Sequence, residues 1–211
     1  MTPEEIRAPA PRVTCYVDGF NLYHALKEHT TARAYRWLNL WSFAESQLLP
    51  GHSLERVIYF TSLPPWSNSK QARHERYIAA LSSVGVETVL GRFQKDEAFC
   101  LATCQQMFYR YNEKLTDVHI ATAMIEDAVK GNIDWAYLVS GDADQAPAIR
   151  AMRRIAPEVK TLVLFPPRRN STELRDVAHR HANLGSKAFR HHVLPDRITV
   201  RGRIIDKPAN W

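Results

Sequence analysis

Apolar and polar positions form alternating blocks along the chain that predict strands and helices in turn. Blocks rich in β-branched and aromatic residues predict strands at 12–18, 54–63, 86–93, 134–140 and 159–165. Apolar residues spaced three and four apart predict helices at 19–29, 40–49, 68–85, 116–131, 145–156 and 171–184. Residues 94–113 follow neither period, and we expect a loop or a short hairpin there.

Polar residues at the helix ends support two of these helices. Thr116 can cap the helix at 116–131, which has the clearest apolar face. Asn68 or Ser69 can cap the helix at 68–85, and Gly85 provides its stop. Both segments therefore carry start signals as well as a helical period.

Strands that alternate with helices predict a mostly parallel sheet covered on both faces. Ligands of such sheets lie beyond the carboxyl ends of the strands, where the winding reverses. If the five strands follow the order 3-2-1-4-5, the first and fourth are neighbours at that point. Asp18 then meets Asp142 and Asp144, and Asp117 could complete the cluster from the start of its helix.

The stretch YLVSGDADQAP, residues 137–147, indicates what such a cluster would hold. Two carboxylates held close repel each other unless a cation lies between them, and hard oxygen ligands suit Mg²⁺ or Mn²⁺. Taken singly, each acid is explained as a helix cap or a loop hydrogen-bonder. Four acids that converge on one strand edge favour a metal site. The chain has no G-x-S-x-G, P-loop or G-x-G-x-x-G motif for a competing centre.

Composition and charge change the picture in two ways. No apolar run approaches the ~18 residues that span a bilayer, the N-terminus lacks a signal sequence, and three cysteines predict free thiols in the cytoplasm. Residues 1–149 carry 14 Lys/Arg and 17 Asp/Glu, whereas residues 150–211 carry 14 and 5. A basic half of this kind suggests a polyanionic partner such as nucleic acid, although a merely solubilising surface is the alternative.

Three segments resemble the NYN domain family, LabA-like branch, of the PIN-like nuclease superfamily: YVDGFNLYHAL, KLTDVHIATAMIEDAVKGNIDWAYLVSGDADQAPAIRAMRR and NSTELRDVA. The resemblance runs from about Val13 to about Leu184. It implies a three-layer α/β/α PIN-like fold and metal-dependent ribonuclease chemistry at Asp18, Asp117, Asp142 and Asp144. The family's polar positions correspond to Asn21 and Ser140. Gln145 stands where many relatives have an apolar residue, which leaves the pocket's shape open.

Other side chains are candidates for substrate binding, each with a structural alternative. Asn21 could hold a phosphate oxygen or cap its helix, and Ser140 could position a ligand or close a turn. Lys114 could neutralise phosphate or be a solvated lysine. Arg168 and Arg169 precede a helix N-terminus, a natural phosphate seat, but could also form a solvated turn. Trp66 could stack a base or pin its loop to the core.

The sequence thus predicts a metal-dependent ribonuclease that cuts single-stranded or looped RNA. Its domain would span 12–190, after a disordered lead-in at 1–11 and before a tail at 191–211. A non-catalytic RNA-binding or regulatory module of the same fold is the alternative. A nucleotide-sugar transferase, whose D-x-D also binds Mn²⁺, fits the basic half poorly. No membrane partner is expected, and a homo-oligomer stays open.

Overall fold

The computed structural model describes residues 9–29, 35–100, 104, 106–200 and 202–209. Its centre is a six-stranded parallel sheet in the order β3-β2-β1-β6-β7-β8. The strands are β1 (Arg12–Asp18), β2 (Ser53–Thr61), β3 (Glu87–Leu90), β6 (Trp135–Val139), β7 (Lys160–Phe165) and β8 (Arg180–Asn183). The predicted parallel sheet and the order of its five strands are confirmed.

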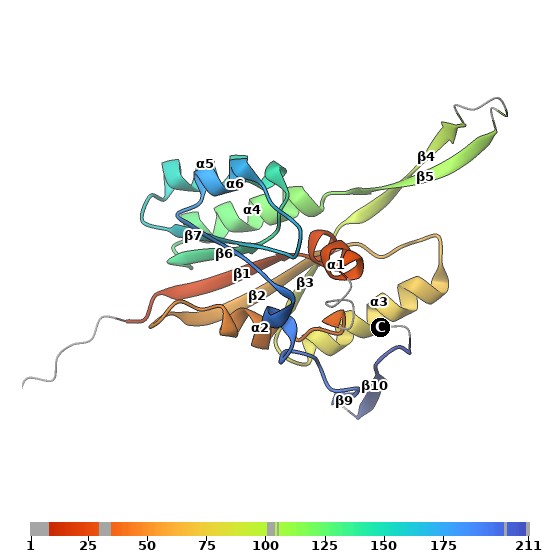
Figure 1. The fold of residues 1–211 in the computed structure, drawn as a ribbon, viewed down its shortest axis with the longest axis horizontal. Coiled ribbons are helices and arrows are strands. Elements are labelled where there is room, and N and C mark those ends of the chain that lie inside the picture. The colour runs from red at the N-terminus through yellow and green to blue at the C-terminus, as the bar shows by residue number, and fades with distance from the viewer. Residues whose placement is uncertain (1–8, 30–34, 101–103, 105, 201, 210–211) are drawn as a thin grey trace, which may run out of the picture.

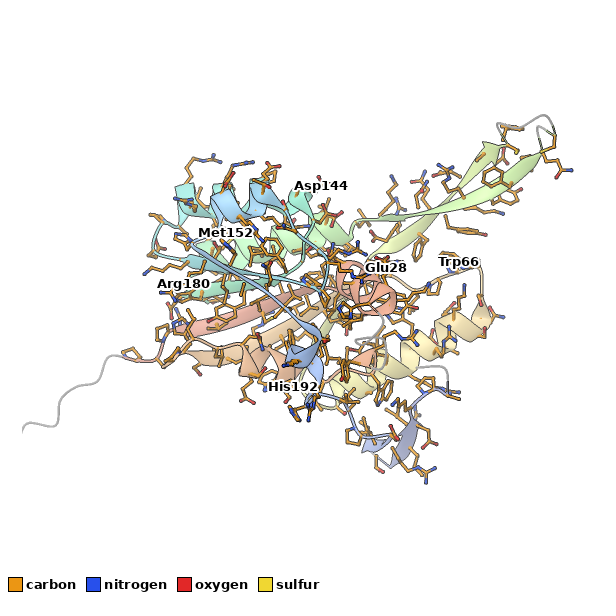
Figure 2. All side chains as sticks on the ribbon, in the orientation of Figure 1. Glu28, Trp66, Asp144, Met152, Arg180 and His192 are labelled. Carbon is orange, nitrogen blue, oxygen red and sulfur yellow. The ribbon has the colours of Figure 1, made fainter. Side chains whose placement is uncertain are left out.

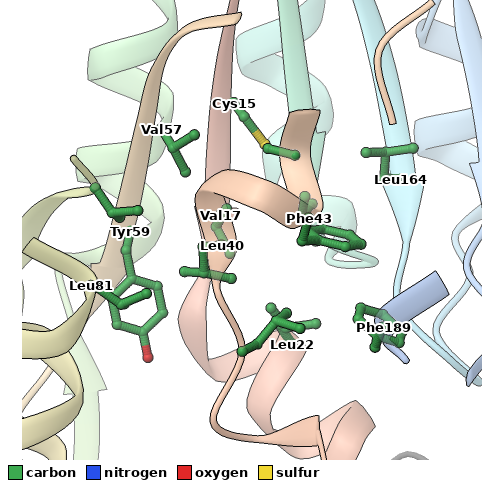
Figure 3. Close-up of a cluster of buried hydrophobic side chains, with 14 of the residues drawn as sticks. Cys15, Val17, Leu22, Leu40, Phe43, Val57, Tyr59, Leu81, Leu164 and Phe189 are labelled. Carbon is green, nitrogen blue, oxygen red and sulfur yellow. The ribbon is translucent and has the colours of Figure 1, made fainter. Parts of the chain in front are cut away.

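Helices cover both faces of the sheet (Figure 1). One face carries α1 (Gly19–Glu28), α2 (Leu40–Ser46) and α3 (Asn68–Ser82). The other carries α4 (Thr116–Val129), α5 (Ala146–Ile155) and α6 (Thr172–Val177). β1 is buried on both faces, as a central parallel strand should be. Figure 3 shows one of the two resulting cores, where Val17 and Tyr59 meet Leu22, Leu40 and Leu81.

The prediction of a helix over residues 171–184 is wrong for its second half. α6 ends at Val177, and residues 180–183 form β8 beside β7. His179 and Thr161 exchange hydrogen bonds where the two strands begin: Thr161 N donates to His179 Nδ1 (3.1 Å), and His179 N donates to Thr161 Oγ1 (3.3 Å). All four side chains of β8 are exposed, so the strand leaves no apolar pattern in the sequence. By pairing with β7, β8 covers the backbone N–H and C=O groups that β7 would otherwise expose as an edge strand.

Residues 92–99 and 107–114 form the two strands of a hairpin, which is one of the two structures expected for residues 94–113. β4 (Arg92–Phe99) and β5 (Met107–Lys114) pair in an antiparallel ribbon that projects from the body of the molecule (Figure 1). The strand expected at 86–93 is therefore split at Gly91. A Cβ there would lie 2.6 Å from Ser62 Oγ and 2.8 Å from the Lys114 carbonyl oxygen. Only glycine permits this approach at the base of the ribbon.

The chain after β8 packs back onto the α1–α3 side. Val193 bridges to Leu38, and Trp37 Nε1 donates to the Pro195 carbonyl (2.9 Å). β9 (Arg197–Val200) and β10 (Arg203–Asp206) form a small hairpin beside α3.

Two expectations from composition hold, and one cap is corrected. All three cysteines are free thiols. Among the helices that the structure describes, none has the length and apolar character to cross a membrane. The cap of α3 is Ser67 rather than Asn68 or Ser69, because the Ser67 side chain accepts a hydrogen bond from Lys70 N.

Candidate metal centre

The winding of the sheet reverses between β1 and β6, and the acidic residues gather there. Val17 pairs with Val139, so Asp18 at the end of β1 lies beside Ser140, which follows β6. Asp142 and Asp144 follow in the turn that leads to α5, and Asp117 lies in the first turn of α4. The topology thus brings together the segments that the sequence placed at this edge.

Asp18 is buried, with 4% of its surface exposed, and it is held at both oxygens. Its Oδ1 accepts a hydrogen bond from Asn21 N (2.9 Å), so Asp18 is the N-cap of α1. Its Oδ2 accepts a hydrogen bond from Ser140 Oγ (2.8 Å). Burial raises the pKa of Asp18 to about 6, against the lowering effect of these two hydrogen bonds. The nearby carboxylates of Asp117 and Asp142 raise this pKa further.

Asn21 and Ser140 shape the turn after β6. Asn21 Oδ1 accepts from Gly141 N (3.0 Å), and Ser140 Oγ accepts from Asp142 N (3.1 Å). Asp142 in turn caps the 3-10 helix Ala143–Gln145 by accepting from Asp144 N (3.1 Å). The two polar residues therefore join the ends of β1 and β6 and set the direction of the acidic turn.

Three carboxylates lie close enough to share one cation. Oxygens of Asp117, Asp142 and Asp144 all lie within 4.8 Å of one another. Burial raises the pKa of Asp117, and repulsion from Asp142 adds to it. A divalent cation relieves this repulsion, and three carboxylates with room for water suit Mg²⁺ or Mn²⁺. Asp18 is outside this group of three, although it lines the same cavity.

Gln145 is buried next to the three carboxylates and donates a hydrogen bond to one of them, Asp117. The side chain is fully buried, and its Nε2 donates to Asp117 Oδ1 (3.1 Å). Its Oε1 is buried and has no hydrogen-bond partner among the residues that the structure describes. The polar residue at this position thus orients Asp117 from the side away from solvent.

Glu113 is a further acid at the site that sequence reasoning missed. It lines the cavity and accepts hydrogen bonds from Ser62 Oγ (3.1 Å) and from the N–H and hydroxyl of Thr116. Thr116 is therefore not the cap of α4. Leu115 occupies the cap position with a left-handed backbone (φ 79°) and no side-chain hydrogen bond. Glu113, which precedes the helix, instead accepts the hydrogen bond from the backbone N–H of Thr116 in the first turn.

The acidic side chains open onto a cavity of about 480 Å³. Asp18, Glu113, Asp117 and Asp142 line it on the acidic side. Arg169 and His24 line it as well, and Arg169 Nη2 donates to Glu28 Oε2 (2.8 Å). A Cβ on Gly141 would lie 2.6 Å from Arg169 Cβ, so glycine is what lets the loops after β6 and β7 approach.

The remaining predicted substrate residues lie outside this cavity. Lys114 and Arg168 are exposed and do not line it. Trp66 lines a second cavity of about 410 Å³ next to the first, together with Phe20, Tyr59 and Phe93. In Figure 2, Trp66 lies on the segment between β2 and α3, and Glu28 on α1.

Comparisons with known proteins show the family and the fold of the chain. The NYN domain family matches residues 12–185. The chain is 27% identical to 6-hydroxy-3-succinoylpyridine 3-monooxygenase HspA of Pseudomonas putida, across 95% of this chain and 75% of that protein. A crystal structure of a protein of unknown function from Vibrio parahaemolyticus shares the fold, with a TM-score of 0.59 and 18% identity over 86% of this chain and 97% of that one. The chain therefore belongs to the NYN domain family of the PIN-like superfamily.

Proposed function

We propose that the protein is a metal-dependent ribonuclease that hydrolyses phosphodiester bonds of single-stranded or looped RNA. The observation that carries the proposal is the group of three carboxylates within 4.8 Å at the switch point of the sheet. Family membership supports nuclease chemistry, and the basic surplus of residues 150–211 supports a nucleic acid substrate.

Asp117, Asp142 and Asp144 would hold Mg²⁺ or Mn²⁺, with Asp18 at their side. A bound ion of this kind neutralises phosphate charge and lowers the pKa of water. Asn21 and Ser140 keep the turn that carries Asp142 in place, and Gln145 orients Asp117. Arg169 supplies a guanidinium that can bind a phosphate oxygen at the wall of the cavity.

The test is cleavage of assorted RNAs with Mn²⁺ or Mg²⁺ and with EDTA. Asp142→Asn and Asp117→Asn should each lose cleavage by at least about a hundredfold, because each removes metal-binding charge without changing shape. Asp196→Asn, an exposed aspartate paired with Lys207, is the matched control and should cleave normally. Cleavage that survives EDTA or both site variants would refute the proposal. RNA binding without any cleavage would favour the non-catalytic module.

A second candidate function is oxygenation of a small aromatic acid. The Pseudomonas putida relative is by name a monooxygenase of a succinoyl-substituted hydroxypyridine. The observation in this chain that favours it is the second cavity, whose walls are aromatic and whose lining includes Arg36 and Arg73. Hydroxylated product from an aromatic acid supplied with O2 and a two-electron reductant such as NADH, in the absence of RNA cleavage, would select this candidate.

A further inference from the structure

The second cavity has a lining that the proposed hydrolysis does not use. It lies between α1, the carboxyl end of β2, α3 and the base of the β4–β5 ribbon. Its aromatic side chains are Phe20, Tyr23, Tyr59, Trp66, Tyr77 and Phe93. Lys27, Arg36, Lys70 and Arg73 add positive charge, and among the described residues that line it none is acidic. Such a lining suits a planar aromatic group joined to an anion.

The two cavities adjoin each other. Phe20 and His24, both on α1, line both of them. Phe20 is two residues from Asp18, and its ring meets the ring of Phe93 edge to face at 5.7 Å. A ligand with its phosphate in the acidic cavity would therefore reach the aromatic cavity with the adjacent part of the same molecule.

The aromatic cavity also offers polar groups, both neutral and charged. His74 Nε2 lies 3.2 Å from both Tyr59 Oη and Thr61 Oγ1. Burial lowers the pKa of His74 to about 4, so this group is uncharged at neutral pH. Arg73 Nε is buried and has no hydrogen-bond partner among the described residues, so it is a donor without an acceptor. Groups of this kind recognise the polar edge of a ring.

Trp66 is placed to stack on such a ring. It packs edge-on against Phe93 (centroids 4.6 Å apart) and tilts against Tyr111 (4.8 Å), yet 42% of its surface stays exposed. The contacts hold the indole in one orientation at the cavity, and the exposed part is free to contact a ligand. Both readings of Trp66 from the sequence, loop anchor and stacking platform, are thus compatible with its position.

We propose that the aromatic cavity binds the base of the nucleotide next to the phosphate held in the acidic cavity. The proposal rests on the proposed function for that phosphate, whereas the base site itself is independent of catalysis. The shared wall favours a nucleotide over a small aromatic acid, because only a nucleotide would occupy both cavities. Exposed Lys27 and Lys70 then lie where flanking phosphates leave the apolar interior.

The test is calorimetric titration of AMP, GMP, CMP and UMP into the protein in EDTA, where no metal contributes. At least one nucleotide should bind. Trp66→Ala should weaken that binding about tenfold, since one stacked base contributes on this scale. Arg73→Gln should also weaken it about tenfold, because the variant loses a charged hydrogen-bond donor. Arg76→Gln is the matched control: it is exposed on the same helix, does not line the cavity, and should bind as the parent does.

The outcomes separate this proposal from the proposed function. Nucleotide binding without RNA cleavage by the parent protein would uphold the base site and refute the nuclease. With an active nuclease, Trp66→Ala should raise KM for RNA more than it lowers kcat. Absence of nucleotide binding, parental affinity in both cavity variants, or saturable binding of benzoate or nicotinate without any nucleotide would overturn the base site.

Discussion

Single residues at the acidic cavity are held in states that are unfavourable without a cation. Burial raises the pKa of both Asp18 and Asp117, and the neighbouring carboxylates raise both pKa values further. Leu115 has a left-handed backbone immediately before the helix that carries Asp117. Local strain and like charges of this kind cluster at functional sites, because function rather than stability selects them.

Asp18 should make the metal-free protein less stable as pH rises. Its pKa is about 6 in the folded state and about 4 in the unfolded chain, so the folded state binds more protons between these values. The contribution of Asp18 to the free energy of unfolding is therefore largest below pH ~4. It falls by roughly 3 kcal/mol as the pH rises through ~6 and the buried carboxyl ionises. In EDTA, Asp18→Asn should therefore melt higher than the parent at pH 7.5 but not at pH 4. Equal melting temperatures at pH 7.5 would contradict the assignment.

Gln145 should act on the site through Asp117. Replacement by Leu keeps the buried volume but removes the donor to Asp117 Oδ1, so the pKa of Asp117 should rise further. Mn²⁺ binding by Gln145→Leu should then need a higher pH than in the parent. Stability should change by less than about 1 kcal/mol, because the lost hydrogen bond is offset by removal of the unpaired Oε1. An unchanged pH profile of Mn²⁺ binding would show that Gln145 only fills space.

At the scale of elements, burial decides what could be predicted from sequence. β1 and α4 carry continuous or helical apolar patterns because they pack in the core, and both were predicted near their true bounds. β8 was missed because its side chains are exposed and its pairing with β7 is non-local. Glu113 was missed because the sequence left its segment open between a loop and a hairpin, so nothing placed this side chain at the acidic cavity. The convergence of the aspartates followed from the strand order alone. The sequence could not show that Arg169 lines the acidic cavity and Arg168 does not, because this depends on the conformation of the loop after β7.

A buried polar network should account for much of the attachment of α4 to the sheet. Asp127 accepts from Tyr16 Oη (2.7 Å) on β1 and from Arg56 Nη1 (2.9 Å) on β2. Asp127→Ala leaves the buried Tyr16 hydroxyl without its acceptor, whereas Arg56 keeps its salt bridge to Glu87, and the variant should be destabilised by about 2 kcal/mol in urea unfolding. Tyr16→Phe removes one hydrogen bond and should cost about 1 kcal/mol. Equal costs for the two variants would mean that the Arg56 interaction contributes nothing.

At the scale of the whole molecule, the basic surplus is not all available to a partner. Several cations of the basic half lie in ion pairs: Arg150 with Glu173, Arg169 with Glu28, Arg197 with Asp206 and Lys207 with Asp196. The pair of Arg169 and Glu28 differs from the other three because its arginine lines the acidic cavity. Removal of either partner should therefore change the field that an entering RNA meets there.

Salt dependence of RNA binding measures that field. In EDTA, where RNA stays uncut, log affinity should fall with log salt at about −0.7 per phosphate neutralised on a single strand. Arg169→Gln should weaken binding across RNA sequences and flatten the slope by about 0.7. Glu28→Gln should strengthen binding, since it frees the arginine and removes a negative charge. Arg154→Gln, exposed on α5 and outside both cavities, is the matched control. A parental slope in Arg169→Gln would show that this arginine serves only its ion pair.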